Sequence, residues 1–237
     1  MSKTLTYSAD GLHFQSQFFA AATATAQAPA VLVFPEAFGL SEHALGKAER
    51  LAGLGYHALA CDLHGDAKLV TDLQEAIGLL QPLFTAPDRT RARAIAALHA
   101  LLAETGATRV AAIGYCFGGT MALELARSGA DIRAAVGFHS GLGSADPVTG
   151  PGMIKASVLV CIGADDPMIP AEQRAAFEGE MRAAQADWQV HVYGGVVHSF
   201  TEPKAASRNM PDAIRYSAAA DARSFASMEV LFREVLA

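Results

Sequence analysis

Residues 109–129, RVAAIGYCFGGTMALELARSG, decide the fold, because a strand-like run, a cysteine between glycines and a helix-like segment follow one another. The apolar run ends at Gly114, Cys116 comes two residues later, and Gly118 stands where the helical pattern begins. A sharp turn from a strand into a helix needs glycines beside its central residue, since strand and helix pass closely there. The pattern favours Cys116 as a nucleophile at the tip of such a turn. The alternative is an ordinary buried cysteine, which behaves as a small apolar side chain.

Strand-like and helix-like segments alternate along the rest of the chain. Short alternating runs around Asp10 and Gly11 predict a β-hairpin, because Asp-Gly is a favoured two-residue turn. Further strands are expected over 30–34, 56–65, 108–114, 132–140, 156–166 and 188–195, helices over 41–54, 68–84, 88–104, 117–127, 171–186 and 213–235, and a small-residue loop over 23–30. Several strands are apolar throughout, which is typical of a sheet covered on both faces. The sequence predicts an α/β fold with a mostly parallel central sheet, helices on both faces and an N-terminal antiparallel hairpin, in one domain over 1–237.

Composition excludes several classes of protein. With 51 % hydrophobic and 18 % charged residues, the chain can bury a sizeable core and is not expected to be disordered. A net charge of −6 gives no reason to expect nucleic acid or an anionic membrane as a partner. The first residues, MSKTLTYSAD, do not resemble a secretory signal, and no apolar run is long enough for a membrane helix. The oligomeric state stays open.

Cysteine usage indicates a reducing compartment. Three scattered cysteines, Cys61, Cys116 and Cys161, do not form a disulfide framework, and no CxxC or HxxxH pairing indicates zinc. We therefore expect a cytoplasmic protein without a cofactor or a metal ion.

Polar residues after the expected strands supply a catalytic set, because sites in open α/β sheets lie at the carboxyl ends of strands. Asp165 and Asp166 end one strand, and His198 follows the last one. This is the chain order nucleophile, acid, histidine that a strand-to-helix nucleophile turn requires. Among eight histidines, His64 and His139 also follow strands, but they precede the acids and are expected to line the pocket. From the pattern alone, either aspartate could orient His198.

Glu36 directly follows the apolar run over 30–34, in the loop where an oxyanion hole is expected. A carboxylate beside such a strand end is expected to be partly buried. Buried carboxyl groups have raised pKa values and often a functional role. The pattern leaves open whether Glu36 is functional or only a turn residue.

Together these residues resemble the dienelactone hydrolase family within the α/β-hydrolase fold. The resemblance is carried by PEAFG (35–39), CDLHG (61–65), GYCFGG (114–119), GADDPMIP (163–170) and VHSF (197–200). It implies a hydrolase of carboxylic esters or lactones that works through a covalent thioester, with Cys116 as the nucleophile and His198 as the base. Asp166 matches the family's acid, because it stands four residues before Pro170.

The same resemblance assigns roles to the loop after residues 30–34. Glu36 matches the family's glutamate that contacts the resting cysteine and can take its proton when substrate binds. The oxyanion donors are then the backbone N–H groups of Phe117 and Ala37.

The chain departs from the family's pattern where that pattern binds an anionic substrate. Four residues past His198, where the family has an arginine, stands Glu202, and Lys68 is the only basic residue over 65–88. An acidic residue at the pocket mouth repels an anion. We therefore expect a neutral, apolar ester rather than dienelactone, in a pocket that includes Phe38, His64, His139, Ser199 and Phe200, with Phe117 beside it.

Three further hypotheses remain at this point. A soft nucleophile in an oxyanion hole could also attack activated phosphotriesters. A redox enzyme or sensor could use Cys116 with Cys61 or Cys161 as the resolving cysteine. A non-catalytic α/β-hydrolase scaffold could bind a small ligand.

Overall fold

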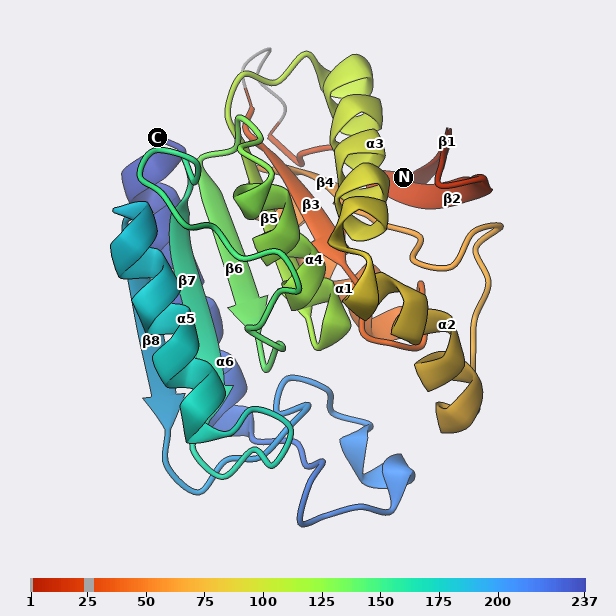
Figure 1. Ribbon diagram of the computed structural model, residues 1–237. Coiled ribbons are helices and arrows are strands. Elements are labelled where there is room, and N and C mark those ends of the chain that lie inside the picture. The colour runs from red at the N-terminus through yellow and green to blue at the C-terminus, as the bar shows by residue number, and fades with distance from the viewer. Residues whose placement is uncertain (1, 24–27) are drawn as a thin grey trace.

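The computed structural model describes residues 2–23 and 28–237, in which one sheet runs through the molecule (Figure 1). Its strand order is β1-β2-β4-β3-β5-β6-β7-β8, parallel from β4 to β8 and antiparallel in the pairs β1–β2 and β2–β4. The strands are β1 (Ser2–Ala9), β2 (Leu12–Phe19), β3 (Ala30–Phe34), β4 (His57–Ala60), β5 (Val110–Tyr115), β6 (Ala134–Phe138), β7 (Ser157–Gly163) and β8 (Trp188–Tyr193). The predicted mostly parallel sheet with an N-terminal antiparallel hairpin is confirmed.

Helices cover both faces of this sheet, which explains why its central strands are apolar throughout (Figure 1). The helices are α1 (Glu42–Gly53), α2 (Leu73–Thr85), α3 (Pro87–Thr105), α4 (Phe117–Arg127), α5 (Ala171–Ala184) and α6 (Ala218–Val235). In β3, Val31 and Val33 belong to the core shared with α1 and α6. Leu32 and Phe34 point the other way, into the core shared with α2 to α5. This alternation follows from the two-residue period of a strand.

The hairpin turn is held against helix α3. Asp10 and Gly11 both have positive φ, 50° and 74°, as a tight hairpin turn of this kind requires. The Asp10 carboxylate accepts hydrogen bonds from Arg89 at 2.7 Å and from Arg93 at 2.7 and 2.9 Å. The bond from Arg89 lowers the pKa of Asp10, and Arg93 adds to this effect. The ion pairs therefore connect the N-terminal hairpin to the helical layer.

Several element boundaries differ from those expected, because local capping decides them. Helix α2 begins after Asp72 rather than at 68, since the Asp72 side chain accepts the N–H of Glu75 at 2.8 Å. The Ser217 side chain caps α6 in the same way, so that helix begins later than 213. Strand β4 is shorter than the expected 56–65. The expected loop over 23–30 falls partly on residues 24–27, which lie outside the described residues.

The loops that carry the predicted site all begin at the carboxyl ends of parallel strands. Because β3, β5, β7 and β8 are parallel, their carboxyl ends lie together. Glu36, Cys116, Asp166 and His198 follow these four strands in that order. In the described part of the chain, no helix has both the length and the apolar character needed to cross a membrane.

Candidate active site

Cys116 occupies a strained turn between β5 and α4. Its φ of 54° and ψ of −122° are backbone angles that side-chain-bearing residues rarely adopt. A Cβ on Gly114 would collide with the backbone of Gly118, and one on Gly118 would collide with the carbonyl oxygen of Phe34. The two glycines therefore allow strand and helix to approach, and the expected sharp turn is present. The Cys116 side chain is partly exposed and lines a pocket.

The sequence predicts that two backbone amide groups, those of Phe117 and Ala37, stabilise negative charge. The N–H of Phe117 is the first in helix α4, where no carbonyl one turn earlier can accept it. The N–H of Ala37 has no hydrogen-bond partner among the described residues. The imidazole Nε2 of His64 donates to the carbonyl oxygen of Ala37 at 2.8 Å and holds this loop in place.

His198 is fixed by Asp166. Its Nδ1 lies 2.8 Å from Oδ2 of Asp166, and the other oxygen of that carboxylate accepts the N–H of Met168 at 2.9 Å. Asp166 is buried, whereas Asp165 is exposed. The alternative that the sequence pattern left open is thus resolved in geometry, because only Asp166 contacts the imidazole.

The second imidazole nitrogen of His198 is not used in a hydrogen bond that holds the fold. Nε2 is buried and has no hydrogen-bond partner within the described chain. Burial alone lowers the pKa of His198, but the nearby sulfur of Cys116 in its charged form and the Asp166 carboxylate raise that pKa further than burial lowers it. The raised pKa therefore depends on a charged Cys116 and favours a protonated imidazole beside a thiolate.

Glu36 is a buried carboxyl group in the loop after β3. Its Oε1 accepts the hydroxyl hydrogen of Ser199 at 3.0 Å and lies 4.0 Å from Nε2 of His139. Burial raises the pKa of Glu36, and the negative charge of Glu202 adds to this. A carboxyl group of this kind takes up a proton more readily than an exposed one.

Three residues that were expected to line the pocket lie behind it instead. His64 supports the Ala37 loop. His139 is fully buried: its Nδ1 faces the N–H of Cys116 at 3.2 Å, and its Nε2 donates to Oγ1 of Thr201 at 2.8 Å. Phe200 is fully buried in the core on the α1 and α6 side. These three side chains are buried and are not part of the pocket wall. Phe38 and Ser199 do line the pocket.

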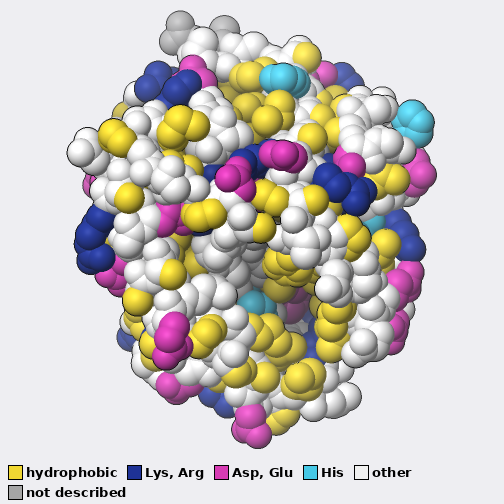
Figure 2. Space-filling model, in the orientation of Figure 1, with side chains coloured by type: hydrophobic (Ala, Val, Ile, Leu, Met, Phe, Trp, Pro, Cys, Tyr) yellow, Lys and Arg dark blue, Asp and Glu magenta, His cyan; other side chains and the backbone are white. Residues whose placement is uncertain are grey.

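The pocket around Cys116 and His198 has a volume of about 780 Å³ and a largely apolar wall. Figure 2 shows this face of the molecule hollowed, with hydrophobic side chains around the opening. The wall is formed by one side of α2 and by residues after β7 and β8, namely Leu73, Ile77, Leu80, Phe84, Met168, Met210 and Ile214. Sequence reasoning missed this wall. The sequence did contain a signal for it, because α2 has more apolar residues than it buries in the core. Leu73, Ile77 and Phe84 stay exposed.

Arg208 was also not predicted from the sequence. It belongs to a 3-10 helix, η1 (Ala205–Arg208), that is too short to show a periodicity. Its guanidinium carbon lies 3.4 Å from the centroid of the Phe38 ring. Arg208 lines the pocket, although neither of the two positions considered from the sequence carries an arginine. Arg208 thus brings a positive charge to this pocket, whereas Glu202, expected at its mouth, lines the adjoining pocket instead.

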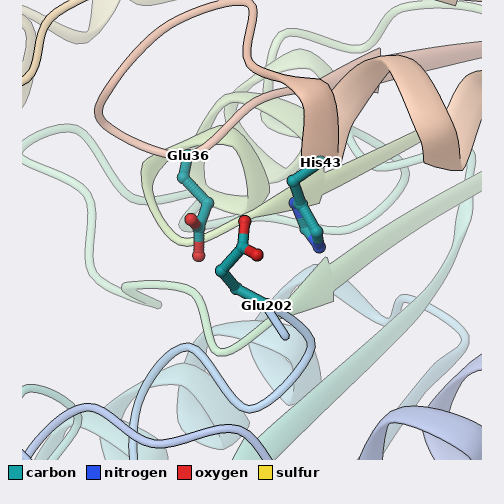
Figure 3. Close-up of side chains that lie close together, drawn as sticks. All are labelled: Glu36, His43 and Glu202. Carbon is teal, nitrogen blue, oxygen red and sulfur yellow. The ribbon is translucent and has the colours of Figure 1, made fainter. Parts of the chain in front are cut away.

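A second pocket of about 650 Å³ adjoins the first and shares Glu36, Phe38 and Arg208 with it. In it Glu36, His43 and Glu202 converge (Figure 3), and one potential ligand atom from each lies within 4.8 Å of the other two. Burial lowers the pKa of His43 to about 4, so its ring is neutral at pH 7. These residues could hold a metal ion, although the sequence offered no metal-binding spacing.

Comparison with known proteins agrees with this geometry. Residues 17–236 match the model of the dienelactone hydrolase family. The solved structure m3DLH is 44 % identical, with a TM-score of 0.94 over 99 % of this chain and 98 % of that one. A dienelactone hydrolase-like promiscuous phosphotriesterase from metagenomic libraries is 41 % identical, with a TM-score of 0.91 over the same shares. A "probable 2-oxo-3-(5-oxofuran-2-ylidene)propanoate lactonase" of Bradyrhizobium sp is 30 % identical over 78 % of each chain.

Proposed function

The chain belongs to the dienelactone hydrolase family, and from this membership we propose that it hydrolyses carboxylic esters or lactones with Cys116 as the nucleophile. One observation carries the proposal. Cys116 on its strained turn and His198, hydrogen-bonded to Asp166 at 2.8 Å, line the same pocket. A nucleophile, a base and a group that orients the base are the parts that acyl transfer requires.

Formation of the thioester is the first half of the proposed reaction. Substrate binding displaces the Glu36 carboxylate, which takes the thiol proton of Cys116, and the sulfur attacks the carbonyl carbon. The N–H groups of Phe117 and Ala37 hold the developing oxyanion. Protonated His198 then gives its proton to the leaving oxygen, so the alcohol departs neutral.

Hydrolysis of the thioester restores the starting state. His198, now neutral and held by Asp166, takes a proton from water, and the resulting hydroxide attacks the thioester carbon. Cys116 leaves as a thiolate and recovers its proton from Glu36. The net reaction consumes one ester and one water and yields one acid and one alcohol.

The proposed substrate is neutral and apolar. The side chains of α2 and the loop that includes Met210 provide an apolar wall, and an apolar ligand gains most from such a surface. The charge of Arg208 is opposed by Glu36 and Glu202 in the adjoining pocket, so it does not give the site a net positive field. Dienelactone, which carries a carboxylate, is the less favoured substrate.

Hydrolysis of activated, neutral phosphotriesters is the second candidate function. The observation that favours it is the 41 % identical structure named a promiscuous phosphotriesterase, which covers nearly the whole chain. Cys116 would attack phosphorus in the same oxyanion cradle. The test is a neutral aryl phosphotriester with the wild type and Cys116→Ala. Equal rates in the two proteins contradict the proposal.

A redox role for Cys116 is less favoured. Cys61 and Cys161 are fully buried, and burial raises the pKa values of both thiols, so neither is placed to resolve a sulfenic acid on Cys116. The three cysteines are free, and a catalytic thiol works best in a reducing compartment. We therefore also propose a cytoplasmic location.

The decisive experiment follows the acyl group. p-Nitrophenyl acetate is mixed with the wild type, and intact-protein mass spectrometry after rapid acid quenching is expected to show one acetyl group on Cys116. Cys116→Ala is expected to lose this adduct and turnover, whereas the matched thiol deletion Cys61→Ala keeps both. Retained turnover in folded Cys116→Ala overturns the assignment of the nucleophile.

A further inference from the structure

Three side chains with metal-binding atoms meet in the pocket next to the one that contains Cys116. Glu36 comes from the loop after β3, His43 from the first turn of α1, and Glu202 from the loop after His198. Figure 3 shows the two carboxylates and the imidazole directed toward one another. One atom from each lies within 4.8 Å of the other two.

Each of the three side chains is held by a hydrogen bond on one polar atom and keeps another atom free. Oε1 of Glu36 accepts from Ser199 at 3.0 Å, and Oε1 of Glu202 accepts from the N–H of Lys204 at 2.8 Å. Nε2 of His43 donates to the carbonyl oxygen of Thr201 at 3.0 Å. Outer bonds of this kind orient metal ligands in proteins. The atoms that remain are Oε2 of both glutamates and Nδ1 of His43.

The free nitrogen of His43 is the most informative of these atoms. A carbonyl oxygen can only accept a hydrogen bond, so Nε2 carries the ring hydrogen and Nδ1 carries a lone pair. Nδ1 is buried and has no hydrogen-bond partner in the described part of the chain. The neighbouring carboxylates offer only lone pairs. Nδ1 and the two carboxylates are therefore three acceptors that lie together. A positively charged group between them would satisfy all three.

Nearby basic side chains make their close contacts elsewhere, although the charge of Arg208 acts on Glu36 and that of Lys204 acts on Glu202. Lys47 pairs with Asp221 at 2.8 Å, and Lys204 pairs with the exposed Glu42. Arg208 is stacked on the ring of Phe38. None of these three has a salt bridge with the Glu36 or Glu202 carboxylate.

We propose that Glu36, His43 and Glu202 form a binding site for a divalent transition-metal ion of the zinc class. One imidazole and two carboxylates are a ligand set that Zn²⁺ accepts, with bonds of about 2.0–2.2 Å and a fourth position left for water. Mg²⁺ prefers oxygen ligands alone and is expected to bind much more weakly. Glu202 is partly exposed, so its side chain has room to rotate toward the other two ligands.

Metal binding at this site regulates the neighbouring one. This consequence rests on the proposed function, in which Glu36 accepts the proton of Cys116. Because Glu36 lines both pockets, an ion bound to it holds this carboxylate away from Cys116, so zinc is expected to inhibit formation of the thioester. The inhibition is reversible, because a chelator removes the ion.

The binding test is isothermal titration calorimetry with zinc chloride in Cys116→Ser, which removes the accessible thiol as a competing zinc ligand. We expect one site per chain. Adding His43→Ala or Glu202→Gln is expected to raise the dissociation constant by about tenfold or more. Adding Glu42→Gln, which removes the same charge from the rim of the same pocket, leaves it within about twofold. Magnesium chloride gives no comparable binding.

Two results overturn the site. One is a zinc affinity that neither His43→Ala nor Glu202→Gln changes, and the other is an equal loss in Glu42→Gln. Circular dichroism verifies the fold of each variant, and Glu202→Gln, in an exposed loop, keeps the test open if His43→Ala is unstable. Inhibition is measured separately with p-nitrophenyl acetate. A protein that binds zinc but hydrolyses no ester contradicts the proposed function alone, and an active enzyme that zinc does not bind contradicts only this inference.

Discussion

Ser199 donates a hydrogen bond to Glu36 at 3.0 Å, although the two residues are 163 positions apart in the chain. The contact joins the loop that carries His198 to the loop that supplies the Ala37 amide. It also lowers the pKa of Glu36 against the larger, raising effect of burial. The Ser199 hydroxyl group thus connects the loop that positions His198 with the protonation of Glu36.

Removing that hydroxyl is expected to change the pH dependence of Cys116. In Ser199→Ala the pKa of Glu36 rises further, because the hydrogen bond that stabilises its charged form is lost. The carboxylate that accepts the thiol proton is then formed only at higher pH. The pH profile of alkylation of Cys116 by iodoacetamide is expected to move to higher pH. An unchanged profile would show that Glu36 does not control this thiol.

Asp166→Asn is expected to reduce kcat for p-nitrophenyl acetate by about 10²–10⁴-fold, because the amide no longer stabilises protonated His198. Asp165→Asn is the matched control, since Asp165 is exposed and stands one residue away. Its kcat is expected to stay within about twofold of the wild type. Similar losses in both variants would contradict the role of Asp166.

Replacement by alanine is expected to have opposite effects on stability at Gly118, in the first turn of α4, and at Gly78, within α2. Gly118→Ala places a methyl group against the carbonyl oxygens of Phe34 and Pro35, so the free energy of unfolding falls by about 1–3 kcal/mol or more. Gly78→Ala, in α2 with open space around it, raises that energy by about 0.4–1 kcal/mol. Urea unfolding followed by circular dichroism measures both. A tolerated Gly118→Ala would contradict the close packing of β3 against α4.

The ion pairs of Asp10 predict an acid-dependent part of the stability. Because the folded pKa of Asp10 lies below its ordinary value of 3.8, its pairing with Arg89 and Arg93 stabilises the fold above that pH. The contribution disappears as the pH falls through the folded pKa. Asp10→Asn keeps a residue that tolerates positive φ and removes the charge. Its deficit in unfolding free energy relative to the wild type is expected at pH 7 and to shrink toward pH 3. An equal deficit at both pH values would assign it to the turn.

Charge at the pocket mouth is expected to set the discrimination between esters. With a chelator present, Glu202→Gln raises kcat/KM for a carboxylate-bearing p-nitrophenyl ester more than for a neutral one of similar size, because a repulsive charge is removed. Arg208→Ala changes the same ratio in the opposite direction. A wild type that prefers the anionic ester would contradict the proposed neutral substrate.

The sequence predicted those parts of the site that follow from strand ends. Cys116, His198 and the pair of aspartates each stand directly after an apolar run, and the parallel sheet brings such positions together. The strand pattern alone did not separate Asp165 from Asp166, because burial distinguishes them; only the family resemblance favoured Asp166. The strand pattern predicts no side-chain positions in the loop after His198, because that loop has neither a helical nor a strand period.

Residues from irregular or unexpected places complete the pocket. Arg208 lies on a single short turn of helix, and no spacing relates it to Phe38, on which it stacks. His43 lies in the first turn of α1, and the fold brings it to Glu202, 159 positions away. The cause is long-range: only the packing of α1 against the loop after β8 places these side chains together.

The apolar wall of the pocket has a practical consequence for laboratory evolution of this protein. The atoms that carry out the proposed chemistry are anchored to the central sheet, whereas Leu73 and Ile77 are carried by α2 and are about half exposed. Substitutions there remove little buried surface and therefore cost little stability. A library randomised at these two positions explores new substrates while the reactive centre keeps its geometry. Phe84 is left unchanged, because its ring packs against Phe117 beside Cys116.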